Sequence, residues 1–173
     1  MPNRLGRKER FFAPGLSKNL AICGITLDLM NSIAIKDKTI QERFKSFPNW
    51  EERYHHIIKT GREMPGLSDA EKSEDLKVKG CQSQVWIKAE LSPDGRVIFR
   101  ADSDALVVRG LIALLVEIYS GEKPDEIISY SPQFIESLEL ANHLSPSRAN
   151  GLFSMLKQIK YYGLAFKALQ AQR

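Results

Sequence analysis

The side chain with the most distinctive chemistry in this sequence is a cysteine in a polar setting. Cys81 lies within Lys79-Gly80-Cys81-Gln82-Ser83-Gln84, directly before a segment of alternating apolar residues. The chain has 2 cysteines, and the other, Cys23, is distant in the sequence. This spacing gives neither a disulfide framework nor a metal-ligand pattern, so both thiols are expected to be free in a reducing compartment. The chemistry to consider is therefore that of a single sulfur nucleophile.

A nucleophilic Cys81 would need help to ionise, because only a small fraction of an ordinary thiol is thiolate at neutral pH. Lys77 and Lys79 could supply positive charge, and Gly80 would permit a tight turn that directs backbone amides toward the sulfur. The alternative is structural, because free cysteine is among the most buried residue types and packs as a small hydrophobic side chain. Spacing alone favours the structural interpretation, whereas the polar neighbours of Cys81 favour a functional one.

Most other familiar catalytic patterns are absent from the sequence. It contains no Cys-x-x-Cys, no glycine-rich phosphate loop and no His-Glu-x-x-His. His55 and His56 are adjacent in a segment expected to be helical, where neighbouring side chains point about 100° apart and do not suit one metal ion. The pattern therefore predicts no metal and no phosphate-bearing cofactor bound by this chain.

Composition and charge indicate one soluble globular domain. The 173 residues are 43% hydrophobic and 27% charged, and the most apolar run, 105–119, is interrupted by Arg109 and Glu117, so no membrane span is expected. Residues 1–36 hold six of the 25 basic residues and two of the 21 acidic residues. Residues 37–173 therefore hold nineteen basic and nineteen acidic residues. A neutral main body argues against a nucleic-acid partner.

The two ends of the chain differ in character. Residues 1–36 are expected to form a basic, flexible extension, and residues 37–170 the folded domain. The extension resembles a secretory signal, but Pro14, Gly15 and Asp28 interrupt its apolar part. A cytoplasmic location is therefore expected.

Hydrophobic periodicity predicts helices in the first part of the domain. Apolar residues at helical spacing indicate one helix over 39–47 and another over 50–60. Asn49 is the expected N-cap of the second helix and Gly61 its expected stop. Residues 61–80 then read as a loop that leads to Cys81.

A β-hairpin follows the cysteine. Residues alternate in polarity over 83–91 and again over 96–102, with Ser92-Pro93-Asp94-Gly95 as the turn, and a short third strand is allowed for. Asp102 and Asp104 precede a long apolar helix over 105–120. Short helices over 124–128 and 133–140 precede a final helix from Ser145 to about Leu169. The predicted fold class is α+β, with a small antiparallel sheet packed against several helices.

Several motifs follow one another along the chain. They are Gly80-Cys81-Gln82-Ser83-Gln84-Val85-Trp86, Asp102-Ser103-Asp104-Ala105, Arg109-Gly110-Leu111-Ile112-Ala113 and the segment His143-Leu144-Ser145-Pro146-Ser147-Arg148-Ala149-Asn150-Gly151-Leu152. Together with residues 49–54 and 61–65, these motifs resemble the SufE family of sulfur-acceptor proteins, including its CsdE-type paralogues. The resemblance covers about residues 37 to 168 and leaves residues 1–36 outside it.

The resemblance implies that Cys81 accepts sulfane sulfur from a persulfide on a cysteine desulfurase. The implied partners are a SufS-like or CsdA-like desulfurase, which carries the pyridoxal phosphate, and a SufB-like iron-sulfur scaffold downstream. It implies the fold of the IscU-type scaffolds, but those hold clusters through three cysteines where this domain has one. A sulfur carrier and desulfurase activator is therefore expected, rather than an independent turnover enzyme, with no cofactor on this chain.

The resemblance also suggests roles for other matching residues. Gly80, Gln82, Ser83 and Gln84 would form the loop that supports the Cys81 thiolate. Asp102 and Asp104 are expected to cap the helix that follows them or to face the partner, with capping favoured for at least one. His143 and Arg148 could face the partner, or Arg148 could pair with an acidic neighbour, which is the favoured role. Trp86 is expected in the core, although it could also shield the persulfide.

Two other functional classes remain open from the residues. The first is a cysteine hydrolase or acyltransferase with His143 or His55 as the base, which requires a histidine within hydrogen-bond reach of Cys81. The second is a non-catalytic interaction module in which Cys81 only packs.

Overall fold

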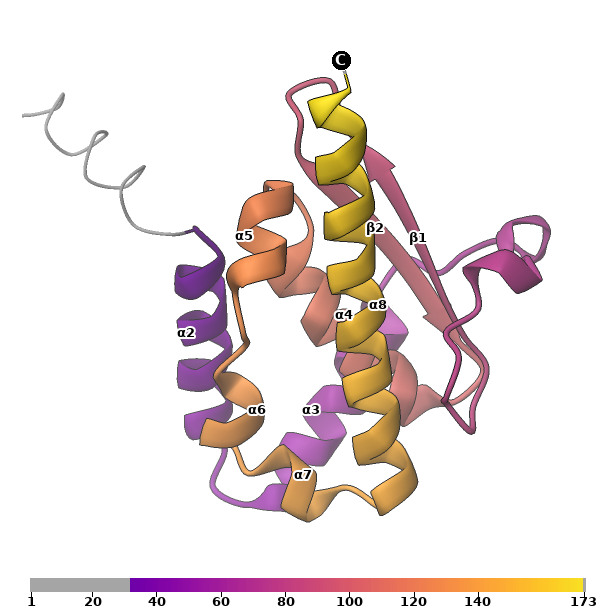
Figure 1. The fold of residues 1–173 in the computed structure, drawn as a ribbon. Helices are drawn as coiled ribbons and strands as arrows, with labels where there is room; N and C mark the ends of the chain where they lie inside the picture. Colours follow the sequence, from indigo (N-terminus) through magenta and orange to yellow (C-terminus); the bar gives the residue numbers. More distant parts are fainter. Residues whose placement is uncertain (1–31, 173) are drawn as a thin grey trace, which may run out of the picture. The chain divides into compact units, whose positions relative to one another are not determined.

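The computed structural model describes residues 32–172, so the predicted flexible extension and Cys23 lie outside the described residues, apart from residues 32–36. The described helices and strands occur in the order α2 (Ser32–Lys45), α3 (Trp50–Glu63), β1 (Val85–Leu91), β2 (Val97–Ser103), α4 (Leu106–Tyr119), α5 (Pro124–Ser129), α6 (Phe134–Ser137), α7 (Leu140–His143) and α8 (Pro146–Ala171). Short 3₁₀ turns form at Asp69–Glu71 and Glu74–Leu76. The α+β class with a small antiparallel sheet is confirmed (Figure 1).

Helix α4 is the centre of the core. It is buried on most of its circumference, and α2, α3, α8 and β2 all pack against it. Its leucine and isoleucine side chains at 111, 112, 114, 115 and 118 are completely inaccessible to solvent. A helix that is apolar nearly all round requires partners on every side, which explains why the single hairpin needs helices to complete the core.

The sheet is the predicted hairpin and has two unlike faces. Val85 pairs with Ser103 at one end and Leu91 with Val97 at the other. Val85, Ile87 and Phe99 are buried on the face toward α4 and α8. The predicted turn is present, with the Gly95 amide donating to the Ser92 carbonyl at 2.9 Å. The third strand is reduced to isolated bridges between Lys77 and Trp86 and between Val97 and Glu122.

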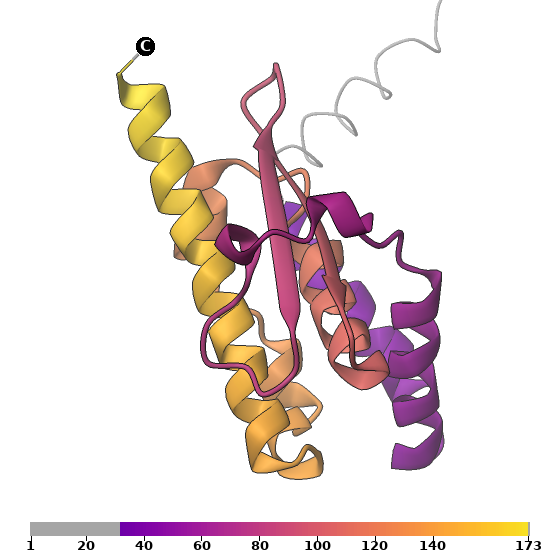
Figure 2. The same ribbon diagram turned by 90° about the vertical axis from the view of Figure 1, so that its right-hand side faces the viewer.

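The other face of the hairpin is covered by the segment between α3 and β1, which Figure 2 shows crossing the strands. Lys88 and Arg100 are directly opposite each other on this face. Glu71 from the crossing segment lies 3.1 Å from Lys88 Nζ and 2.6 Å from Arg100 Nη1, so one carboxylate compensates two like charges. Trp86 is half-buried on this face, with Lys72 Nζ 5.7 Å from the centroid of its ring. The prediction that Trp86 lies in the core is therefore wrong. Strand alternation places it on the outer face.

Helix α2 begins earlier than predicted, because residues 32–36 are helical and contribute contacts. Ile33 is buried in the core, and Lys36 Nζ lies 2.5 Å from the buried carboxylate of Glu122. The folded domain therefore includes residues 32–36, which the sequence analysis placed in the extension. Asp37, also buried, accepts hydrogen bonds from the Phe134 amide at 3.0 Å and from Tyr130 Oη at 2.7 Å, and so ties α2 to the start of α6.

Helix α3 begins as predicted but ends later. Asn49 accepts a hydrogen bond from the Glu52 amide at 2.9 Å, which confirms its capping role. Gly61 does not stop the helix, which continues to Glu63. A Cβ on Gly61 would lie 2.6 Å from the Gly110 amide nitrogen, so this glycine permits α3 and α4 to approach closely.

The helix predicted over 133–140 is interrupted. Glu139 adopts φ 51°, in the left-handed region, and separates α6 from α7. The final helix is confirmed, since Ser145 is its N-cap and Pro146 its first residue, and it reaches Ala171. No helix among residues 32–172 combines the length and apolar character needed to cross a membrane.

Candidate functional site

Cys81 lies in a short loop whose base is closed by backbone contacts. The Val78 amide donates to the Val85 carbonyl at 2.8 Å, and Lys77 forms a bridge with Trp86. Between these contacts the chain turns through Gly80, where φ is +88°, a conformation that glycine adopts without steric cost. The tight turn expected at Gly80 is therefore present, and residues 79–84 form a loop that projects from the edge of the hairpin.

The sulfur of Cys81 is half-buried against the first turns of α8. Its only hydrogen-bond acceptor among the described residues is the Gly151 carbonyl, 3.7 Å from Sγ. Burial raises the pKa of the Cys81 thiol above its ordinary value. Lys77 pairs with Glu74 at 3.3 Å, and Lys79 is exposed. The expected support of a thiolate is therefore not present in this arrangement, where the thiol is neutral at pH 7.

A cavity of about 300 Å³ adjoins the sulfur. Its walls come from the cysteine loop, from α4 and from the start of α8: Cys81, Gln82, Ser83, Val108, Ser145, Ser147, Arg148 and Gly151. Of the residues predicted for the site, Gln82, Ser83 and Arg148 therefore share a cavity with Cys81. The remaining predicted residues do not line it.

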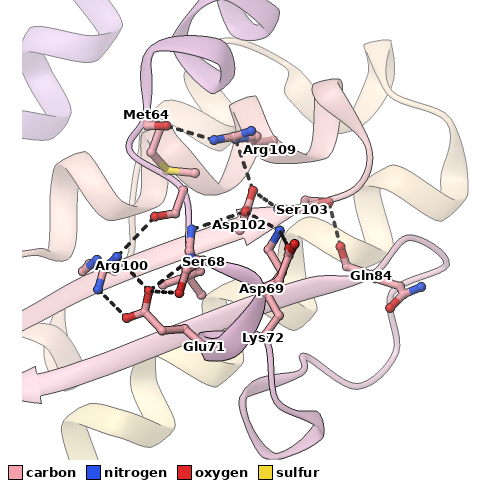
Figure 3. Close-up of polar contacts among 12 residues, drawn as sticks. Met64, Ser68, Asp69, Glu71, Lys72, Gln84, Arg100, Asp102, Ser103 and Arg109 are labelled. Atoms are coloured by element: carbon pink, nitrogen blue, oxygen red, sulfur yellow. Dashed lines mark hydrogen bonds and ion pairs between the residues drawn. The ribbon is translucent and has the colours of Figure 1, made fainter.

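Gln84 and Asp104 fix the end of the loop that enters β1. The Gln84 amide donates to Asp104 Oδ1 at 3.0 Å, and the Gln84 carbonyl accepts from the Asp104 amide at 3.2 Å. The same carbonyl accepts from Ser103 Oγ at 2.9 Å, a contact visible in Figure 3. Because three hydrogen bonds hold Gln84, only residues 79–83 lie between fixed ends.

The prediction that Asp102 or Asp104 caps α4 is wrong. The N-cap is Ala105, and the side chain that bonds its amide is Ser103 Oγ, at 3.3 Å, and neither aspartate. Asp104 accepts a hydrogen bond from the Gln84 amide, and Asp102 is buried on the outer face of β2, where its carboxylate binds groups other than the first amides of α4.

Asp102 is instead the centre of a buried ionic network (Figure 3). Its carboxylate lies 3.1 Å from Lys72 Nζ and 3.3 Å from Arg109 Nε, and it accepts from the Leu67 amide at 3.3 Å. Burial acts to raise the pKa of this carboxyl, but the Lys72 ammonium, two backbone amides and Arg109 outweigh it and hold the pKa below its ordinary value. The network attaches the 64–72 segment to β2 and α4.

His143 and Arg148 both contact α3. The His143 ring stacks on Trp50 with centroids 4.0 Å apart, and Arg148 Nη1 donates to Tyr54 Oη at 3.1 Å. Arg148 forms no ion pair among the described residues, so its predicted acidic neighbour is not found. Both side chains are exposed near the start of α8, where a partner could reach them.

Within residues 32–172, no histidine accompanies Cys81 as a general base. Neither His143 nor His55 lines the cavity or hydrogen-bonds the sulfur. Nor do three His, Cys, Asp or Glu side chains in that part of the chain gather at a spacing that could hold a metal ion. The arrangement does not supply the histidine that a cysteine hydrolase or acyltransferase requires.

Sequence reasoning gave no place in the site to Gly151, Ser145, Ser147 or Val108, although all four line the cavity. The first three stand in one of the ordered motifs, so their pattern was visible in the sequence. Their proximity to Cys81 was not, because about 70 residues separate the loop from the start of α8.

Comparison with known proteins agrees with this fold and gives the family. The family model described as "SufE: Fe-S metabolism associated domain" matches residues 38–162. The chain is also similar to the solution structure of a hypothetical protein from Thermus thermophilus, with a TM-score of 0.64 and 24% sequence identity over 77% of this chain and 96% of that one. The structural match concerns the fold, whereas the family model covers most of the chain. The chain therefore belongs to the SufE family, whose domain is associated with iron-sulfur metabolism.

Proposed function

We propose that this protein is a sulfur acceptor in which Cys81 carries sulfur as a persulfide. The observation that carries the proposal is a lone, half-buried thiol beside a cavity, with no side-chain base hydrogen-bonded to its sulfur and no second thiol in the described residues. Acyl transfer would need a base, and dithiol redox chemistry would need a resolving cysteine. Sulfur transfer between thiols needs neither, and a nearby resolving thiol would discharge the persulfide.

The proposed donor is the persulfide of a pyridoxal-phosphate cysteine desulfurase of the SufS or CsdA type. The Cys81 thiolate attacks the outer sulfur of the donor persulfide and forms a new S–S bond. The donor S–S bond breaks, its electron pair leaves with the desulfurase cysteine as thiolate, and Cys81 becomes a persulfide. No net oxidant or reductant is consumed, because the transferred sulfur keeps its oxidation state.

The pKa of Cys81 sets a condition on this step. Because the retracted thiol is neutral at pH 7, it must lose a proton on leaving the buried position or on meeting positive charge from the partner. Hydrogen bonds fix both ends of the loop, at Val78 and at Gln84. Any extension that brings Cys81 to a partner is therefore confined to the residues between them. We infer that docking of the desulfurase and extension of this loop precede the chemistry.

The second half of the proposal is delivery of the sulfur to iron-sulfur cluster assembly, on a SufB-like scaffold. The family description associates the domain with iron-sulfur metabolism. A carrier whose cysteine must stay a free thiol between rounds of loading is suited to a reducing compartment such as the cytoplasm. The protein would thus act as a carrier and desulfurase activator rather than as an enzyme with its own turnover.

Paired cysteine variants test the proposal. We expect the wild-type protein and Cys23→Ser to accelerate alanine formation by the desulfurase, and Cys81→Ser to give no acceleration. Cys81→Ser should unfold in urea within about 1 kcal/mol of the wild type, because the substitution changes one atom at a half-buried site. Undiminished acceleration by Cys81→Ser would refute the role of Cys81.

A further inference from the structure

Gly151 lies in the second turn of α8, where its missing side chain has a specific neighbour. Glycine within a helix is less stable than alanine, so a buried glycine at this position calls for a reason. A Cβ built there would meet one atom within 4 Å apart from its own helix backbone, and that atom is Cys81 Sγ at 3.6 Å. This is an ordinary van der Waals distance. Alanine would therefore fit beside the resting thiol without displacing it.

The persulfide form of Cys81 needs more space than the thiol. The outer sulfur of a persulfide lies about 2 Å beyond Sγ. It cannot take the direction of the thiol hydrogen, because the Gly151 carbonyl oxygen is 3.7 Å from Sγ and the outer sulfur would overlap with it. The outer sulfur must turn toward the cavity, and it needs about 3.5–4 Å of clearance from carbon atoms. Gly151 lines this cavity, and because it has no side chain, the space beside its Cα stays open.

We propose that Gly151 is the residue that lets the retracted loop hold a persulfide as well as a thiol. A methyl group at this position would contact the reduced sulfur at a normal distance but would remove part of the rotation available to the outer sulfur. The glycine thus determines which form of Cys81 can be sheltered. This inference rests on the proposed function, since it concerns the loaded state of the same cysteine.

The test compares Gly151→Ala with the wild type and with Asn150→Ala, a matched control at an exposed neighbouring position of α8. Each protein is purified in a Cys23→Ser background, so that Cys81 is its only thiol, and is loaded with inorganic polysulfide in the absence of any partner. Intact mass confirms that a single sulfur has been added. Cyanide then removes the outer sulfur as thiocyanate and leaves the Cys81 thiolate. The rate of thiocyanate release reports the accessibility of the outer sulfur, and alkylation of the reduced protein reports that of the thiol.

We expect thiocyanate release from Gly151→Ala to be about tenfold faster than from the wild type, because crowding drives the outer sulfur out of the cavity. Alkylation of the reduced variant should match the wild type, and Asn150→Ala should match it in both assays. Loading should also lower the melting temperature of Gly151→Ala relative to its own reduced form. Because both forms carry the same substitution, its general effect on stability cancels in this difference.

Two results would overturn the role of Gly151. One is equal thiocyanate release from Gly151→Ala and the wild type. The other is equal acceleration of thiol alkylation and thiocyanate release, which would mean that the glycine only seats the thiol. Failure of the wild type to form any persulfide, from polysulfide or from a desulfurase, would instead refute the proposed function.

Discussion

Cys81 combines two properties that seem opposed in a nucleophile. Its sulfur is accessible enough to line a cavity, yet burial raises the pKa of its thiol and keeps it neutral at rest. A neutral thiol reacts slowly with oxidants and alkylating agents, because the thiolate is the reactive form. The resting arrangement therefore protects the cysteine until a partner engages the loop.

The raised pKa predicts the pH dependence of alkylation. Below its pKa the thiol of Cys81 is protonated, so the rate of reaction with iodoacetamide should rise about tenfold per pH unit through pH 8 and still be rising at pH 9. The measurement is the alkylation rate of Cys81, followed by peptide mass across this range. A plateau below pH 8 would contradict the burial of the sulfur.

The same shift of pKa has a consequence for stability. Because the folded state favours the neutral thiol, its contribution to stability is present below the ordinary thiol pKa and is lost as the pH rises through the raised value. Cys81→Ser, which does not ionise in this range, should lack that alkaline loss and so serves as the control.

Individual residues were predictable from the sequence where local geometry decides their role. Gly80 could be predicted as a turn, because glycine adopts tight-turn conformations without steric cost. Asn49 could be predicted as a cap, because it stands before an amphipathic helix. The roles of Asp102 and Asp104 could not, because carboxylates before a helix resemble caps in any sequence. Only the pairing of β2 with β1 directs one outward and the other toward Gln84.

At the scale of elements, α3 and α4 approach each other closely. Gly61 and Gly110 face each other where these helices pack, and a Cβ on Gly110 would lie 2.6 Å from Ile57 Cγ2 and closer still to the Ile57 backbone oxygen. A glycine that ends a helix and one that packs inside it look alike in a sequence. That ambiguity explains the wrong prediction that Gly61 stops α3.

This contact predicts that Gly110→Ala destabilises the fold, although alanine is the better helix former. The methyl group would have to displace the backbone of α3, so we expect a loss of about 2 kcal/mol or more in the free energy of unfolding by urea. Gly151→Ala is the matched control and should equal or exceed the wild type by up to about 1 kcal/mol in the reduced protein. A Gly110→Ala variant within about 0.5 kcal/mol of the wild type would show that the helices can separate at little cost.

Across the whole molecule, the order and type of most elements followed from periodicity, but the assembly of the site did not. The hairpin and the final helix are encoded locally and were predicted near their true bounds. The cavity depends on the start of α8 meeting a loop about 70 residues earlier, and no local pattern specifies that meeting. The burial of Asp37 beneath α6 is another long-range contact of this kind.

Mass spectrometry of the protein after reaction with a desulfurase and cysteine tests whether Cys81 carries sulfur. We expect one added sulfur, located by peptide analysis on Cys81 and absent from Cys23, and lost in Cys81→Ser but kept in Cys23→Ser. Absence of added sulfur from Cys81, under conditions where the desulfurases tested, SufS-like and CsdA-like, form their own persulfides, would contradict the proposed role of Cys81.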